Sequence, residues 1–276
     1  MSSPVTPQPA PVRLAQDHIR IVQAIYGILV SLALRDLVEG IPKCLFWILH
    51  KSGEQWGAYC LLLVSICSST LSLALRFFFI SQEITDQLLY YYRNGQRFSK
   101  LWVTLVHYPM VVVQGSLFYA VCDRLTEALN RDSAPRLEGI GVAIILHATL
   151  LLTNAAWLSR FALLKARSKH QIGMWAAIYP LAIRTSIAYA IAKVKRRFLG
   201  TRASQQLVAQ LHSHERAFNC EATWMTFNSL FAVFAFAMLY FYKPLTLIPA
   251  IVIFGGFTLN SILDLSLAAE FYVPKE

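Results

Sequence analysis

Residues 245–272 read LTLIPAIVIFGGFTLNSILDLSLAAEFY, and this stretch decides the fold class of the chain. A helix needs about 20 mainly apolar residues to cross the hydrocarbon core of a bilayer. The stretch is longer than that, and its only charged residues are Asp264 and Glu270. The composition agrees, because 14% of the 276 residues are charged and 56% are hydrophobic, whereas a soluble domain has about 25% charged residues. The chain is therefore predicted to be an integral membrane protein.

Five other apolar segments are long enough, or nearly so, to span a membrane. They are Ile19–Leu34, Gly57–Ile80, Leu101–Cys122, Gly139–Leu164 and Cys220–Tyr242. Together with residues 245–272 they predict an all-α polytopic helical bundle with six transmembrane helices. The first segment is short, and Arg35, Asp36 and Glu39 follow it at once. Its helix is expected to enter the membrane interface there and to end by Pro42.

A seventh stretch, Gly173–Ala192, is apolar enough to span but has Pro180 and Arg184 near its middle. An arginine at the centre of a bilayer costs about 2.5–3.5 kcal/mol even on the scale that penalises it least. If this stretch does not span, the Lys and Arg residues gather strongly on one side; if it does, they divide almost evenly. The positive-inside rule therefore favours six spans over seven, with both termini cytoplasmic. The stretch is then a re-entrant or interfacial helix.

The predicted organisation has three parts. A flexible proline-rich tail covers residues 1–18, a single transmembrane domain covers 19–272, and a C-terminal tail covers 273–276. Within the domain, segments 81–100 and 165–219 lie on the cytoplasmic side. Both are expected to contribute amphipathic helices that lie against lipid or dock a partner protein. The outer connection, residues 123–138, is predicted to be a solvated, turn-rich loop.

The net charge of +10 is interpreted as a sign of topology and of attraction to anionic lipid, not to nucleic acid. The expected contact with anionic lipid at the cytoplasmic face is made by four basic residues: Lys193, Lys195, Arg196 and Arg197. A homo-oligomer and a cytosolic or membrane protein partner are further expectations.

The word SLALR occurs twice, at Ser31–Arg35 and at Ser72–Arg76. Because consecutive spans run in opposite directions, the two arginines are expected at opposite faces of the membrane. Arg76 precedes a run of phenylalanines, so it is expected about one turn inside the inner boundary. Asp264 of the last helix approaches the same side, and an intramembrane ion pair between Arg76 and Asp264 is predicted.

Several polar residues within the apolar segments could line a path between helices. They are Arg76, Asp264, Asn260, Asn228, His147, Asn154 and Glu221. Such residues often do no more than join helices by hydrogen bonds. The leading hypothesis is a channel or transporter that passes an ion or small solute along this path. The alternative is a non-catalytic membrane sensor or scaffold that docks a cytosolic partner through the basic amphipathic segments.

An enzyme is less expected, because the chain has no HExxH motif and no GxSxG beside a candidate base. No cofactor is expected. The histidines and Glu215 of HSHE, residues 212–215, lack further metal ligands, so no metal site is predicted. The five cysteines form no CxxC pair and are interpreted as small buried hydrophobic residues.

Overall fold

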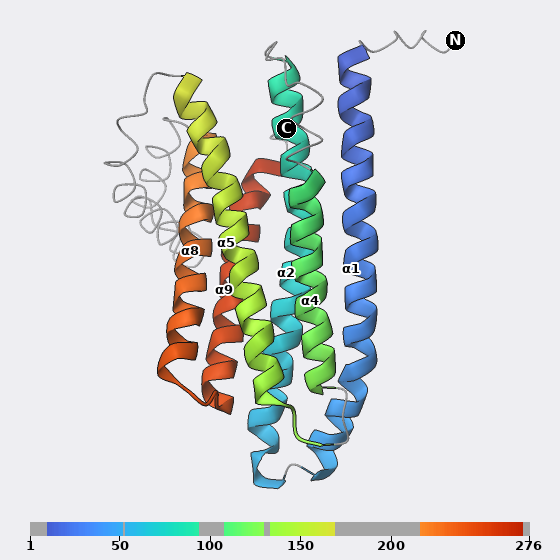
Figure 1. Ribbon diagram of the computed structural model, residues 1–276, viewed down its shortest axis with the longest axis vertical. Helices are drawn as coiled ribbons and strands as arrows, with labels where there is room; N and C mark the ends of the chain where they lie inside the picture. The colour runs from blue at the N-terminus through green and yellow to red at the C-terminus, as the bar shows by residue number, and fades with distance from the viewer. Residues whose placement is uncertain (1–9, 52, 94–107, 130–132, 169–215, 273–276) are drawn as a thin grey trace, which may run out of the picture. The chain divides into compact units, whose positions relative to one another are not determined.

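The computed structural model describes residues 10–51, 53–93, 108–129, 133–168 and 216–272. These residues form six α-helices and one 3₁₀-helix, and no strand occurs among them. The elements are α1 (Ala10–Lys51), η1 (Gly53–Gln55), α2 (Trp56–Arg93), α4 (Tyr108–Leu129), α5 (Leu137–Ser168), α8 (Arg216–Phe241) and α9 (Leu247–Tyr272) (Figure 1). The prediction of an all-helical chain is confirmed for this part.

Three stretches of these helices are long and apolar enough to cross a membrane, as judged by length and composition. They are Gly53–Arg76, Leu137–Ala156 and Leu247–Asp264. A shorter apolar stretch, Thr226–Phe241, lies in α8. The predicted seventh stretch, residues 173–192, lies outside the described residues.

Helix α1 is much longer than the segment Ile19–Leu34 predicted for it. It begins at Ala10, within the predicted flexible tail, and Pro11 lies in its first turn, where a missing N–H costs nothing. It also continues past Pro42 to Lys51. Proline removes a single helical hydrogen bond, and the apolar residues that follow it keep the helix packed against α2. The expectation that this helix ends by Pro42 is wrong.

Two other boundaries also differ from prediction. Helix α2 continues without a break to Arg93, so residues 81–93 belong to the same helix as the apolar stretch before them. Helix α4 runs on to Leu129 and takes in half of the predicted loop 123–138. The added α4 residues, DRLTEAL, include neither glycine nor proline, and several are good helix formers. The first polar residues after the apolar run of α4 mark the end of that run, but the helix continues through them to Leu129.

The chain divides into two units, each described by itself. The first unit is Met1–His147 and Tyr242–Thr258, and the second is Ala148–Phe241 and Leu259–Glu276. In the first unit, α1 packs against both α2 and α4. The turn between α1 and α2 contains Gly53, whose φ of 59° is the left-handed conformation that glycine adopts most easily. Helices α1 and α2 therefore form an antiparallel hairpin.

The alignment of this hairpin bears on the relative heights of Arg35 and Arg76. The rings of Trp47 and Tyr59 are in contact, with centroids 5.3 Å apart. If α1 and α2 stay antiparallel from this contact onward, Arg35, twelve residues before Trp47, comes near the height of Leu71, twelve residues after Tyr59. Arg76 is five residues, or about 7 Å, beyond Leu71. On this alignment the two SLALR words lie at similar heights in the hairpin, which counts against the prediction that the two arginines lie at opposite faces of a membrane.

The contact between α1 and α4 is close and largely apolar. Tyr26 donates a buried hydrogen bond of 2.7 Å to Gln114. Beside it, a Cβ atom added to Gly115 would overlap the side chain of Leu29. Phe118 is completely buried one turn further along α4. The absence of a side chain at Gly115 is what allows the two helices to approach this closely.

Helix ends from three parts of the first unit meet at one height. The backbone N–H of Arg136, just before α5, donates to the carbonyl of Ala128 at the end of α4. Gly141 of α5 faces Leu245, just before α9. The α1–α2 hairpin extends beyond these helix ends of the first unit, as the lower part of Figure 1 shows. We call this part, residues 44–63, the hairpin tip.

Candidate functional site

The second unit holds a buried hydrogen bond between two asparagines from different helices. Asn260 of α9 donates from Nδ2 to Oδ1 of Asn228 in α8 at 2.9 Å, and both side chains are completely buried. Each residue lies near the middle of its helix, so the bond joins α8 and α9 well away from their ends. An amide pair in an apolar interior satisfies one donor and one acceptor that lipid could not satisfy.

More polar groups lie buried beside this pair along the chain. Ser261 follows Asn260, and Asp264 comes one turn later on nearly the same face of α9. Their exposed fractions are 1% and 2%. Asn154 of α5, also in the second unit, is 2% exposed. Among the described residues, no hydrogen-bond partner occurs for Asn260 Oδ1 or Ser261 Oγ. The second unit therefore keeps buried acceptors that a cation or water can use.

Several hydroxyl groups in the described helices are satisfied locally instead. Thr70, Ser72, Thr153 and Thr258 each donate to a backbone carbonyl three or four residues earlier, at 2.8–3.1 Å. This is the usual way in which serine and threonine lie within an apolar helix. These four hydroxyl groups have a structural role within their own helices. The bond between Asn228 and Asn260 is different because it joins two helices, and Asp264 is a buried carboxylate one turn away from it.

His147 belongs to the first unit and lies against an aromatic ring. Its imidazole stacks on Phe257 with centroids 3.9 Å apart and an angle of 20° between the planes, and it is 1% exposed. Phe254 meets Phe257 edge to face. Nε2 of His147 has no hydrogen-bond partner among the described residues. Its surroundings within the first unit are those of a packed core histidine.

The predicted ion pair between Arg76 and Asp264 stays a prediction. Both residues are buried, at 4% and 2% exposed, but they belong to different units. The other predicted site residues are only partly described. Glu221 lies in α8, but its side chain is outside the described part, as are all four residues of the predicted lipid contact: Lys193, Lys195, Arg196 and Arg197. Of the predicted set, the structure shows Asn228 and Asn260 in direct contact.

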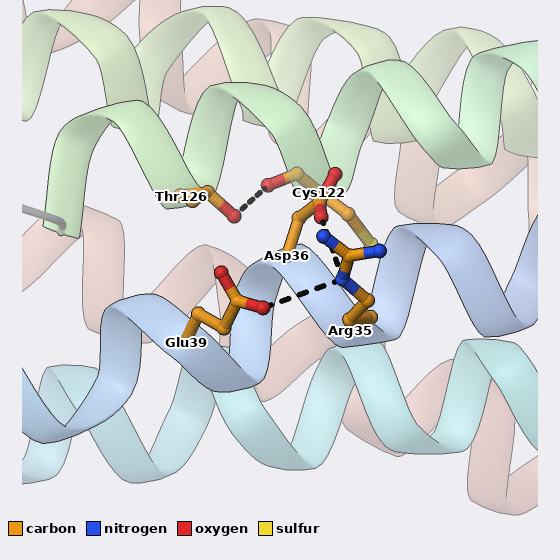
Figure 2. A network of polar contacts seen from close by, with 5 residues as sticks. All are labelled: Arg35, Asp36, Glu39, Cys122 and Thr126. Atoms are coloured by element: carbon orange, nitrogen blue, oxygen red, sulfur yellow. Dashed lines mark hydrogen bonds and ion pairs between the residues drawn. The ribbon is translucent and has the colours of Figure 1, made fainter.

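A second polar cluster lies on the surface of the first unit (Figure 2). Arg35 Nε lies 3.3 Å from Glu39 and 3.8 Å from Asp36, all on α1. Figure 2 shows them beside Cys122 of α4, whose carbonyl accepts a hydrogen bond from Thr126. The side chains of Arg35 and Glu39 are 68% and 65% exposed. Arg35 and Glu39 therefore lie on the exposed side of α1, whereas Asp36 lies between Arg35 and Cys122.

Two features of the site were missed by the sequence reasoning. Tyr26, the partner of Gln114, could not be singled out from the sequence as a buried hydrogen-bond donor, because tyrosine is common in apolar helices. The sequence did indicate that the first helix continues past Arg35. Arg35, Glu39 and Lys43 are four residues apart with alternating charge, a spacing that places them on one face of a single helix. It was overlooked because the helix was expected to leave the membrane at Arg35.

No group of three or more histidine, cysteine or acidic side chains able to hold a metal occurs among the described residues. The described cysteines with visible side chains are free thiols; Cys44 and Cys122 are buried, and Cys60 and Cys67 are half-buried. The chain matches no protein-family model, and no curated protein or solved structure shows significant similarity to it.

Proposed function

We propose that the chain is an integral membrane protein with six spanning helices that passes an ion or small solute along a polar path between its helices. The path includes Asn228, Asn260 and Asp264. The observation that carries the proposal is the buried hydrogen bond between Asn228 and Asn260, with Asp264 buried one turn further along α9. Buried polar and acidic groups in spanning helices are costly, and they typically mark ion or substrate pathways.

Membrane insertion itself is supported by the surface of the helices. Large hydrophobic side chains point outward on helices of both units; examples are Ile28 (61% exposed), Val64 (59%), Val233 (60%) and Ile248 (71%). Soluble monomers seldom expose apolar surface over so many elements. Lipid is the solvent that this surface fits.

Reconstitution into vesicles tests the proposed transport. The purified chain should raise the flux of at least one class of solute above that of empty vesicles, with monovalent cations, protons, inorganic anions and small neutral solutes assayed separately. An assay with cations and protons comes first, because the described groups in the second unit are oxygen acceptors and a carboxylate. Flux equal to that of empty vesicles for every class would rule out the transport proposal.

Topology provides a separate test. With six spans and both termini cytoplasmic, cysteines introduced at Thr201 and Lys275 should both be inaccessible to an impermeant thiol reagent in intact cells. Both should become reactive once the membrane is permeabilised. The half-buried native cysteines require an unmodified chain as the baseline. Labelling of Lys275→Cys alone from outside would favour seven spans.

A scaffold function has one observation in its favour. Helix α2 continues from Arg76, where the candidate span ends, to Arg93. At 1.5 Å per residue this adds about 25 Å of helix beyond the apolar stretch. Such an extension suits a docking arm. The proposed anionic-lipid contact of Lys193, Lys195, Arg196 and Arg197 would then hold the same face of the protein to the membrane.

A further inference from the structure

Two oxygen atoms on neighbouring residues of α9 are buried without a hydrogen-bond partner in the part of the chain that the structure describes. They are Oδ1 of Asn260 and Oγ of Ser261. Buried polar side chains in folded proteins nearly always have a partner. Two adjacent exceptions within an apolar helix therefore indicate that these oxygens bind a group other than the chain itself.

The hydrogen bond to Asn228 fixes how the amide of Asn260 is turned. Nδ2 of Asn260 donates to Oδ1 of Asn228 on α8 at 2.9 Å. Oδ1 of Asn260 is on the other arm of the same planar amide, so it is directed away from that bond. Asn260 therefore offers an acceptor, and not a donor, to a group that lies beside α9 at this level.

The hydroxyl of Ser261 differs from the hydroxyl one turn before it. Thr258 donates to the carbonyl of Phe254 at 3.0 Å, the usual arrangement in an apolar helix. Ser261 makes no such bond to the described backbone. Its Oγ is therefore available as a ligand, although a backbone carbonyl of the same helix could have accepted its proton.

Asp264 adds a carboxylate on the same side of α9. At about 100° per residue, Asp264 lies about 40° from Asn260 and about 60° from Ser261 around the helix axis, so it falls between them. Side chains three and four residues apart are neighbours on a helix surface. Asp264 is buried like the other two, and all three residues belong to the second unit. One face of α9 thus holds an amide oxygen, a hydroxyl and a carboxylate within about one turn.

We propose that Asn260 Oδ1, Ser261 Oγ and the carboxylate of Asp264 bind a dehydrated monovalent metal cation, Na⁺ or K⁺. This rests on the proposed function, since it names the class of solute that passes along the polar path. The amide oxygen and the hydroxyl replace water molecules around the ion, as carbonyl oxygens do in selectivity filters. The carboxylate sets the sign of the ion, because a negative charge attracts a cation and repels an anion.

The ligand set fits a metal ion with a single charge. Calcium takes about six to eight oxygen ligands, and several of them are normally carboxylates. Asp264 is the one carboxylate among the side chains that the structure describes in the second unit. A proton would need only that carboxylate and would give Asn260 Oδ1 and Ser261 Oγ no role. A monovalent metal ion uses all three groups.

Thermal unfolding of the full chain in detergent measures binding without transport. NaCl or KCl should raise the unfolding temperature in a saturable way relative to choline chloride at the same ionic strength, because a ligand of the folded state stabilises it. Asp264→Asn should abolish this rise. Equal unfolding temperatures in NaCl, KCl and choline chloride would overturn the proposal. A dependence on pH alone would also overturn it and would make Asp264 a proton-binding group.

Ser261→Ala tests the neutral oxygens. It should raise the apparent dissociation constant for the cation at least about tenfold, while the unfolding temperature in choline chloride stays close to that of the wild type. The matched control is Thr258→Val, which removes a hydroxyl that is already bonded to the backbone and should leave the cation affinity unchanged. Wild-type affinity in Ser261→Ala, or an equal loss in Thr258→Val, would contradict the site. If Asp264→Asn does not fold, Ser261→Ala decides.

The binding and flux measurements separate this inference from the proposed function. A cation-dependent unfolding temperature without flux in vesicles would support the cation site and rule out transport. Flux without any effect of Na⁺ or K⁺ on unfolding would leave transport in place and overturn the cation site.

Discussion

Replacing Gly115 by leucine should strongly destabilise the first unit. A single Cβ atom at this position already overlaps the end of the Leu29 side chain, so the larger leucine side chain must displace Leu29 and push α1 and α4 apart where Leu29 cannot move far enough. Overpacking of this kind costs about 1–3 kcal/mol. The separation also breaks the neighbouring hydrogen bond from Tyr26 to Gln114, worth about 1 kcal/mol. Thermal unfolding in detergent, followed by the loss of the monodisperse chromatographic peak, measures the effect.

Gly27 offers a matched control for this variant. It lies in α1, close in sequence to Tyr26, and nothing lies within 4 Å of a Cβ added there. Gly27→Leu should therefore unfold at nearly the wild-type temperature. Adding Leu29→Ala to Gly115→Leu should recover part of the lost stability, because it removes the side chain that is overlapped. Equal stability of the two leucine variants would show that α1 and α4 do not meet at Gly115.

Replacing Asp264 by asparagine should abolish solute flux in reconstituted vesicles while leaving the amount of folded protein close to wild type. Asparagine has nearly the same shape and keeps hydrogen-bonding capacity, but it carries no charge and cannot release a proton at neutral pH. Flux should fall to the level of empty vesicles if the carboxylate binds the passing ion. The measurement is the initial rate of uptake per folded molecule.

The control for this variant is Asp123→Asn. Asp123 is an exposed aspartate on α4, so this variant makes the same chemical change at the surface. Flux in Asp123→Asn should remain at the wild-type level. Asn260→Leu tests the neighbouring amide, because it removes the bond to Asn228 without changing charge. Undiminished flux in Asp264→Asn would remove Asp264 from the path, and the asparagine pair would then be a structural link between α8 and α9.

The apolar segments could be predicted from the sequence because a long apolar run is a strong local signal of a buried or membrane-spanning helix. Each of the six predicted segments corresponds to a described helix, although residues 101–107 of one lie outside the described part. The ends of the helices could not be predicted in the same way. A helix such as α1 continues past Arg35, Glu39 and Pro42 because helical hydrogen bonding does not require apolar side chains.

The polar contacts were predictable only as candidates. Asn228 and Asn260 stand out from the sequence because each is a lone amide in an apolar run. Their pairing depends on the relative height of α8 and α9, which no local pattern encodes. The height of Arg35 within the hairpin could not be predicted for a related reason. It depends on where the chain turns, and the turn lies at Gly53, well beyond the last residue of the predicted first span.

The α1–α2 hairpin also bears on how the chain assembles. Trp47 and Tyr59 are neighbours along the chain as well as in space, whereas Tyr26 and Gln114 are 88 residues apart. Contacts between residues close in sequence lose little entropy when their loop closes, and they form early. During synthesis the hairpin is complete before α4 has left the ribosome. We therefore expect α4 to dock on a hairpin that has already closed, and a variant that weakens the Trp47–Tyr59 contact should slow the closing of that hairpin.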